Sequence, residues 1–320
     1  MATQPALREP STGPGSEGPK ARRGLRRLRR ARGPVEVSWW FLVPGLAIYG
    51  LVLVYPSIQG VGFAFTDWSG LASDFEFTGL ANFRTFLADP QAYSALSNTI
   101  IIALGITVIQ NAVGLAIALA VHSNLKARAI LRVLFVLPTT VATVIVAVLW
   151  SYLYTSRGPI NLALGSVGLD EFTRSWVGDP STVLGAIVLV VVWQFAGYSM
   201  VIFLAGLESI PGELQEAASL DGAGAFSRFL HVTLPLIAPA LTINLMLSLI
   251  GGLKLFDQIF VMTGGGPGYA SETLSTALYK QAFQSGRFGY GTAIALVLTV
   301  FVTFAALLQL FVLRRHGEHN

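Results

Sequence analysis

The sequence predicts an all-α, polytopic membrane protein with six transmembrane helices and a further helix on the cytoplasmic side. The first observation is compositional: 53% of the 320 residues are hydrophobic and 12% are charged. Soluble domains carry about 25% charged residues, so this chain has too few to cover the surface of a soluble fold. The second observation is that the apolar residues are gathered in long runs. The third is that lysine and arginine are distributed unevenly between the segments that separate those runs.

The apolar runs define the predicted spans. A helix needs roughly 20 apolar residues to cross a hydrocarbon core of about 30 Å. The first run is short and contains Pro44, and the third contains Pro138. Proline is tolerated in such helices because neighbouring helices or waters can satisfy the carbonyl group that it frees. The six predicted spans are residues 39–55, 99–121, 129–154, 183–207, 237–262 and 292–313.

Two tails are predicted to flank this transmembrane domain, residues 1–38 and 314–320. Residues 1–38 hold nine of the 21 lysines and arginines, and their low hydrophobicity predicts disorder. A basic run of this kind could bind nucleic acid or acidic lipid. A hydrophobic span follows at once, however, which favours a topology anchor beside membrane lipid, with no nucleic-acid partner. No small-x-small cleavage site follows the first apolar run, so we expect an uncleaved signal anchor.

The basic residues also predict the orientation. If the N-terminus is cytoplasmic, the inner segments hold 15 of the 21 lysines and arginines and the outer segments hold five. The remaining one, Lys254, lies inside the fifth span. Because basic residues concentrate on the cytoplasmic side, both termini are predicted to be cytoplasmic. The same tally places the connection between the fourth and fifth spans, residues 208–236, in the cytoplasm. We expect the protein to lie in the inner or plasma membrane of the cell.

No catalytic or metal-binding motif is recognisable. A Walker-type phosphate loop needs a Gly-Lys pair, but the four lysines follow Pro, Leu, Leu and Tyr. The glycine run at 264–268 has no following lysine and is typical of a turn. Cysteine is absent, and His316 and His319, in the C-terminal tail, do not make a closed ligand set. We therefore expect a non-enzymatic chain with no cofactor, no metal and no ATPase site of its own.

The connection at 208–236 has the pattern of a short helix, a sharp turn and a second helix. Pro211 suits a helix start, and Glu216 complements the positive N-terminal end of a helix dipole. Gly222 can end the helix, and Ala217 and Ala218 allow another surface to approach closely. Such a helix suits insertion into a groove on a partner protein. The alternative is that Glu216 only stabilises its own helix.

At these residues the chain resembles a known family. Glu216-Ala217-Ala218, Asp221-Gly222 and the later Leu234-Pro235 match the EAA loop of ABC importer permeases. The stretch 256–267 is similar to the Phe-Asp…Thr-Gly-Gly-Gly-Pro stretch of the maltose-permease-like carbohydrate branch, which belongs to binding-protein-dependent transport systems. The resemblance covers roughly residues 39–313.

The resemblance implies a type I permease fold and several partners. Glu216, Ala217, Ala218, Asp221 and Gly222 would form the coupling helix that docks into a cytoplasmic ATPase. A second homologous permease would pair with this chain, and two ABC ATPase copies would bind the ATP and Mg. An extracellular sugar-binding lipoprotein would deliver a sugar or oligosaccharide, and transport would proceed by alternating access.

Polar side chains inside the spans are candidates for the substrate path, because such groups are costly in lipid. An aromatic ring from Trp193 or Tyr198 could stack on a sugar, and Ser248 or Gln194 could supply hydrogen bonds. Helix packing is the alternative for each. The candidates are Tyr198, Ser248, Trp193, Gln194, Asn244, Lys254 and Asp257.

Two of these candidates also have a structural interpretation. Lys254 and Asp257 are three residues apart and could form an ion pair on one helix face. By the resemblance, Tyr198 and Ser248 keep the residue type found at sugar-contact positions of maltose permeases. Val191, Gly252 and Leu255 replace amides at other contact positions, which argues against maltose itself.

Two other functions remain open from the sequence. A secondary, ion-coupled transporter would have inverted repeats and intramembrane carboxylates but no docking helix. An ABC permease for a non-sugar solute such as glycerol-phosphate would need several cations in its cavity, whereas Lys254 is the one basic residue inside the predicted spans apart from Arg132, near the cytoplasmic start of the third.

Overall fold

The computed structural model describes residues 39–122 and 127–317, so the predicted tail 1–38 and the last three residues lie outside its description. Most of the described residues are helical and none lies in a β-strand, and an isolated antiparallel bridge joins Thr66 to Phe77. This agrees with the predicted all-α class. The chain divides into two units, residues 1–56 and 57–320, and each is described by itself.

The described part of the first unit is one apolar helical run. It consists of η1 (Trp39–Phe41), α1 (Val43–Tyr49) and the wider turn η2 (Gly50–Val54), and it continues into α2 (Tyr55–Phe63). Pro44 lies in the first turn of α1, where its missing N–H has no partner to lose. The run Val43–Phe63 is long and apolar enough to cross a membrane, and it ends later than the predicted 39–55.

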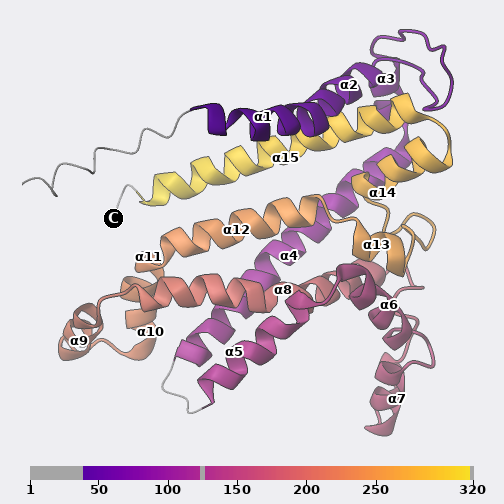
Figure 1. Ribbon diagram of the computed structural model, residues 1–320. Helices are drawn as coiled ribbons and strands as arrows, with labels where there is room; N and C mark the ends of the chain where they lie inside the picture. The colour runs from indigo at the N-terminus through magenta and orange to yellow at the C-terminus, as the bar shows by residue number, and fades with distance from the viewer. Residues whose placement is uncertain (1–38, 123–126, 318–320) are drawn as a thin grey trace, which may run out of the picture. The chain divides into compact units, whose positions relative to one another are not determined.

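Three helices form the core of the second unit. They are α4 (Pro90–His122), α8 (Val183–Glu208) and α12 (Ala238–Leu253), and α4 packs against both of the others (Figure 1). Glycines make the contacts close: a Cβ at Gly114 would lie 2.6 Å from that of Ser199, and one at Gly252 would lie 2.8 Å from the Cα of Ala103. Small residues at such crossings let helix backbones approach where lipid provides no hydrophobic drive.

The third predicted span, 129–154, is not one helix. It is divided into α5 (Arg128–Val136), the 3-10 turn η3 (Leu137–Thr140) and α6 (Thr143–Leu153), and its two parts are bent by 95°. Pro138 lies in η3, where its ring is compatible with the tight turn. Gly197 of α8 packs directly against the backbone of Phe135, since a Cβ there would overlap the Phe135 carbonyl oxygen.

The fifth predicted span, 237–262, is also interrupted. The connection before it comprises α9 (Gly212–Leu220), α10 (Ala225–Arg228), η5 (Phe229–Thr233) and α11 (Leu234–Leu236). The run Ala225–Leu236 meets α12 at a bend of 72°. α12 then ends at Leu253, and the chain resumes as α13 (Asp257–Met262). Within the described residues, four helices could cross a membrane unbroken, or up to six if each bent pair is one span.

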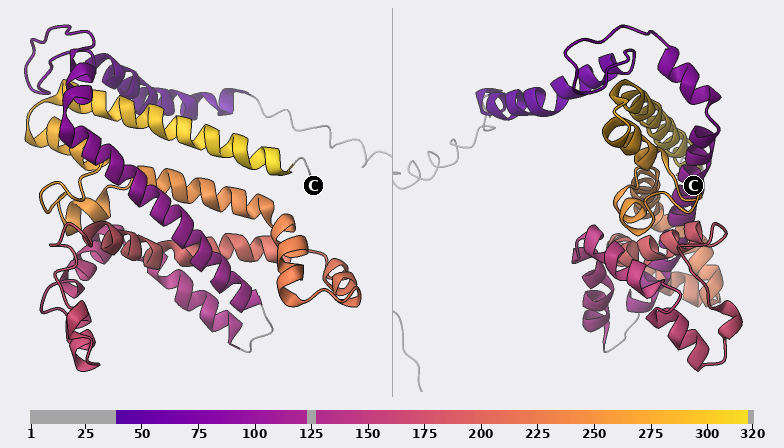
Figure 2. Two further views of the ribbon diagram at one scale, coloured as in Figure 1. Left: turned by 180° about the vertical axis from the view of Figure 1, so that it is seen from behind. Right: turned by 90° about the vertical axis from the view of Figure 1, so that its right-hand side faces the viewer.

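The remaining elements are α3 (Ala81–Ala88), α7 (Pro159–Ser166), η4 (Asp170–Phe172), α14 (Leu274–Tyr279), η6 (Lys280–Gln284) and α15 (Phe288–Gly317). α15 exceeds the predicted span 292–313 at both ends and packs against α12 and α14 (Figure 2). Aromatic rings join its start to the first long loop: Trp68 lies 4.1 Å from Phe63 and 5.0 Å from Phe288, between ring centroids.

Candidate functional site

A central cavity of about 410 Å³ lies between the core helices α4, α8 and α12 and the short helix α13. Tyr198, on α8, lines one side of it, and Asn244 and Ser248, on α12, line another. Lys254 and Asp257 lie at the break between α12 and α13 and line it as well. Five of the seven predicted path residues are therefore brought together around one space.

A layer of buried hydrogen bonds supports the cavity wall. Gln110 donates to the Ser199 hydroxyl at 2.9 Å, and Asn111 donates to the Ser248 hydroxyl at 2.8 Å. Asn244 donates to the Ser199 carbonyl at 3.1 Å. These bonds link α4, α8 and α12, so the amides of Asn111 and Asn244 also hold the helices together, as polar groups in membrane bundles do. The Oδ1 atom of Asn111 has no partner.

The other two predicted path residues, Trp193 and Gln194, do not line this cavity. Trp193 is exposed and packs edge-on against Trp150, with ring centroids 5.4 Å apart. Gln194 is buried; it donates to the Val141 carbonyl at 3.1 Å and accepts a hydrogen bond from Gln258 at 3.3 Å. Because Val141 lies between η3 and α6, Gln194 satisfies backbone at the bend of the third predicted span.

The expected ion pair between Lys254 and Asp257 is absent, although both residues are described. The expectation assumed a continuous helix, whereas α12 ends at Leu253 and α13 begins at Asp257. The sequence interpretation also missed Phe195 and Phe256 as lining residues, whereas Gln258, a polar residue of the fifth predicted span, does line the cavity. Phe195 could have been found, because it lies three residues before Tyr198 and so shares its helix face.

The helix α9, which is predicted to be cytoplasmic, and the turn after it expose most of the EAA residues to solvent. Glu216, Ala217, Asp221 and Gly222 are exposed, and Ala218 is half-buried. Leu220, within this group, is 89% exposed. Leu214 and Phe226 of the same connection are exposed as well, and several exposed apolar side chains in one segment are typical of a surface that a partner covers.

The turn after α9 is fixed by backbone hydrogen bonds and one glycine. Gly222 adopts a φ of 80°, and the next amide, that of Ala223, donates to the Ala218 carbonyl at 3.0 Å. This pattern closes a helix C-terminus with a left-handed residue, a position that glycine occupies without strain. On the opposite side, Gln215 donates to the Thr233 hydroxyl at 3.3 Å and attaches α9 to η5.

One ion pair connects this region to the third predicted span. Arg132 of α5 lies 2.7 Å from Glu208, the last residue of α8, and both side chains are partly exposed. Glu208 immediately precedes the connection that carries α9. Among the described residues, no group of three or more His, Asp or Glu side chains could hold a metal ion.

Comparison with known proteins agrees with this architecture. Residues 110–317 match the family described as binding-protein-dependent transport system inner membrane component. The chain is 35% identical to a probable ABC transporter permease, YurN of Bacillus subtilis, over 86% of this chain and 94% of that protein. It is 32% identical to the multiple sugar-binding transport system permease MsmF of Streptococcus mutans, over 85% of this chain and 93% of that one.

A solved structure shares the fold. It is the crystal structure of a bacterial ABC transporter involved in import of the acidic polysaccharide alginate, with a TM-score of 0.74 and 24% identity. The match covers 87% of this chain and 96% of that one. The helical architecture, the matched residues and the identity over most of the chain lead to one conclusion: this chain belongs to the binding-protein-dependent transport system inner membrane component family and is a permease subunit of an ABC importer, not an ATPase.

Proposed function

We propose that this permease carries an uncharged sugar or oligosaccharide through the central cavity. The lining of that cavity is the observation that carries the proposal. Tyr198 and Phe195 offer ring faces for the C–H surface of a sugar, and Gln110, Asn244 and Ser248 offer amide and hydroxyl groups. Recognition sites combine a mostly apolar lining with a few polar groups in this way. The Streptococcus mutans relative is itself named for multiple sugar-binding transport.

The charges of the cavity disfavour an anionic solute. Among the residues that line it, Lys254 carries a positive charge and Asp257 a negative one. A solute such as glycerol-phosphate would be attracted to one of them and repelled by the other. The same two residues could act on an ion in a secondary transporter, but the exposed coupling helix has no role in such a protein.

The transport cycle that we propose depends on partner chains. A second homologous permease completes the pathway, and two ATPase copies bind ATP and Mg below it. Glu216, Ala217, Ala218, Asp221 and Gly222 dock into the ATPase, so closure of the ATPase dimer moves the two coupling helices together and opens the cavity outward. An extracellular binding protein then releases the sugar, and hydrolysis resets the pathway. Both termini are cytoplasmic in this arrangement.

Uptake of a panel of radiolabelled sugars by a deletion strain, complemented with the full transporter, tests this proposal. We expect at least one saccharide to be taken up with ATP and without an ion gradient. Replacement Tyr198→Ala should weaken uptake of that sugar and change its ranking against others in the panel. Tyr152, exposed on α6 and outside the cavity lining, provides the matched control Tyr152→Ala. Equal sugar dependence in both variants would remove Tyr198 from the path, and uptake of glycerol-phosphate alone would overturn the assignment to sugars.

A further inference from the structure

A second cavity, of about 290 Å³, adjoins the central one at the break between α12 and α13. It lies between that break, α14 and α15, and Ser275, Tyr279 and Leu298 are among its lining residues. Two further residues, Lys254 and Phe256, line both cavities. These two side chains therefore form a shared wall, and the space that is open to a solute depends on them.

Phe256 is the bulky member of the shared wall, and neighbouring rings hold it in place. Its ring stacks on that of Phe260, with centroids 5.0 Å apart, and lies 5.4 Å from the ring of Tyr279 on α14. Phe260 and Tyr279 also contact each other, at 4.9 Å between centroids. Because a ring packed against two others has little freedom to swing aside, Phe256 is a fixed part of the wall.

The backbone on both sides of Phe256 is fixed as well. Gly252, near the end of α12, packs so closely on α4 that a Cβ there would lie 2.8 Å from the Cα of Ala103. At the start of α13, Gln258 donates to the side chain of Gln194 on α8 at 3.3 Å. The residues between these two contacts have little room to shift, so the extent of the shared wall is determined by the side chain at position 256.

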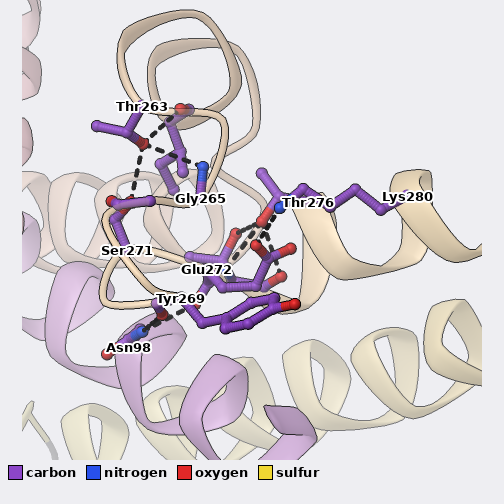
Figure 3. A network of polar contacts seen from close by, with 11 residues as sticks. Asn98, Thr263, Gly265, Tyr269, Ser271, Glu272, Thr276 and Lys280 are labelled. Atoms are coloured by element: carbon purple, nitrogen blue, oxygen red, sulfur yellow. Dashed lines mark hydrogen bonds and ion pairs between the residues drawn. The ribbon is translucent and has the colours of Figure 1, made fainter. Parts of the chain in front are cut away.

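A network of polar contacts fixes the opposite wall of the second cavity (Figure 3). The side-chain amide of Asn98 on α4 donates to the Glu272 carbonyl at 3.0 Å, just before α14 begins. The carboxylate of Glu272 pairs with Lys280, which follows α14, so the two ends of this helix are joined. The glycine turn predicted at 264–268 lies against the same carboxylate, since a Cβ at Gly265 would overlap its Oε2. The wall formed by α14 is therefore rigid.

We propose that Phe256 sets the upper length of the transported saccharide, because its ring closes the central cavity toward the second one. The proposal rests on the proposed function for its substrate class. A solute that fits the central cavity of about 410 Å³ is accepted, whereas a longer one meets the ring of Phe256. Lys254 does not impose the same limit, because it is exposed and its stem is flexible. A smaller residue at position 256 joins the two cavities and admits further sugar rings.

Thiol labelling tests the shared wall without any sugar, and the chain suits this method because it contains no cysteine. Leu298→Cys places one thiol in the second cavity, inside the sixth predicted span, where a charged reagent does not arrive through lipid. The full transporter in lipid nanodiscs is treated with 2-sulfonatoethyl methanethiosulfonate, and mass spectrometry measures modification of this chain. With Phe256 present, the thiol should remain unmodified over the time in which added Phe256→Ala allows complete modification.

Phe283→Ala is the matched control for this experiment. Phe283 lies 5.3 Å from Tyr279, between ring centroids, and so belongs to the same aromatic group, but it lines neither cavity. Its replacement removes an equal ring and should leave the labelling rate of the Leu298→Cys thiol unchanged.

Saccharide binding provides the second measurement. Saturation-transfer NMR on the same nanodiscs compares malto-, chito- and xylo-oligosaccharides of increasing length, without the binding protein and its own length selection. The wild-type transporter should prefer shorter members of a series. Phe256→Ala should shift this preference about tenfold toward longer members, which is the discrimination that a change of pocket size gives. Phe256→Leu keeps more of the packing and should shift it by less, so the test remains decisive if the alanine variant does not fold.

The outcomes separate this proposal from the proposed function. If the Leu298→Cys thiol is labelled equally fast with and without the Phe256 ring, or if Phe283→Ala speeds labelling as much, the shared wall is wrong even when sugar uptake is normal. Faster labelling with an unchanged length preference would overturn the role of Phe256 in selection. If Phe256→Ala opens the second cavity but the wild-type transporter takes up no saccharide, the proposed function fails and the shared wall stands.

Discussion

The segments on either side of the fifth predicted span are built in opposite ways. The outer one, residues 263–291 by prediction, buries its polar side chains: Ser271, Glu272 and Thr276 are all at most 3% exposed. Its turn is held by hydrogen bonds to α4 through Asn98 and Thr99. The inner one, residues 208–236, has no buried residue in α9 or α10, and Leu220 and Phe226 are 89% and 75% exposed.

This difference indicates that the two segments serve different purposes: one contributes to the stability of the subunit and the other to its function. Buried hydrogen-bonded networks specify a single conformation, and breaking them leaves unsatisfied groups. An exposed helix with apolar residues contributes little to the free energy of unfolding of the isolated subunit. We therefore expect substitutions of the buried polar residues of the outer segment to act on folding, and substitutions in α9 to act on coupling.

The largest effect should follow from Gly222→Asp in the inner segment. Aspartate tolerates the left-handed backbone of this turn, so the subunit should fold and reach the membrane, while the added carboxylate blocks docking. We expect uptake to fall to background with at most a small fall in the thermal midpoint, since the left-handed backbone is only mildly strained by aspartate. Gly224→Asp is the matched control, because Gly224 has a φ of −64° and open space at its Cβ. Retention of both transport and ATPase co-purification in Gly222→Asp would contradict the docking role.

Glu216→Lys probes the same surface by charge. Glu216 is exposed on α9 and lies in its second turn, so its replacement should change the docking face without a packing defect. We expect uncoupled transport with normal membrane content, measured by uptake and by immunoblotting of membranes. Loss of the protein from the membrane would show instead that Glu216 supports folding.

The next largest effect should be on stability, from Gly265→Ala in the outer segment. Its Cβ would overlap Glu272 Oε2, and its backbone is left-handed. Strain and overpacking together should cost about 3 kcal/mol. Gly268→Ala shares the left-handed backbone, at a φ of 54°, but has open space and should cost about 1 kcal/mol. Thermal unfolding of the purified complex compares them, and equal losses would reject the packing argument.

The ion pair between Arg132 and Glu208 should give a smaller, functional effect. Exposed pairs of this kind contribute roughly 0–1 kcal/mol to stability, so Arg132→Ala should leave the thermal midpoint nearly unchanged. Because Glu208 precedes the α9 connection, we expect a partial loss of uptake per ATP hydrolysed. The double variant Arg132→Glu with Glu208→Arg should recover most of it. Failure of this exchange to recover coupling would remove the pair from the coupling pathway.

The smallest effect should come from Thr233→Val, which removes the acceptor of the Gln215 side chain. The bond measures 3.3 Å and is partly buried, so its loss should lower the free energy of unfolding by less than about 1 kcal/mol. Uptake should fall by less than in the Arg132 variant. A full loss of uptake would mean that η5 itself takes part in docking.

Much of the helical pattern could be predicted because a long apolar run in lipid forms a helix, which satisfies the backbone hydrogen bonds within the run itself. The fourth span was predicted as 183–207 and is observed as Val183–Glu208. The bends at 141–142 and near Ile237 were not predicted: Pro138 before the first and Pro239 just after the second were local signals, but contacts with other helices also set the bends. Gly197 against Phe135 is such a contact. The break after α12 also had a local signal: Gly251 and Gly252 directly precede the last residue of α12, and glycine weakens a helix.

Only part of the candidate site could be predicted from the sequence, because the facing of a helix in the bundle also depends on its neighbours. α8 is apolar all round, so its hydrophobic pattern does not show which face meets the cavity. Both aromatic residues of this helix were predicted to line the path, but in the structure Tyr198 lines the cavity and Trp193 does not. The exposure of α9 was easier to predict, because this helix consists mostly of small and charged residues and has few apolar ones.

The glycine contacts of the core helices have a consequence for movement. At Gly114 and Gly252 the backbones of α4, α8 and α12 meet with no large side chain between them that could adopt another rotamer. Interfaces of this kind resist sliding, so we expect these three helices to rotate as one rigid body during the ATP cycle. The bends before Thr143 and before Ala238 would then act as hinges. These three helices would then move together and transmit the conformational change of the ATPase to the sugar path.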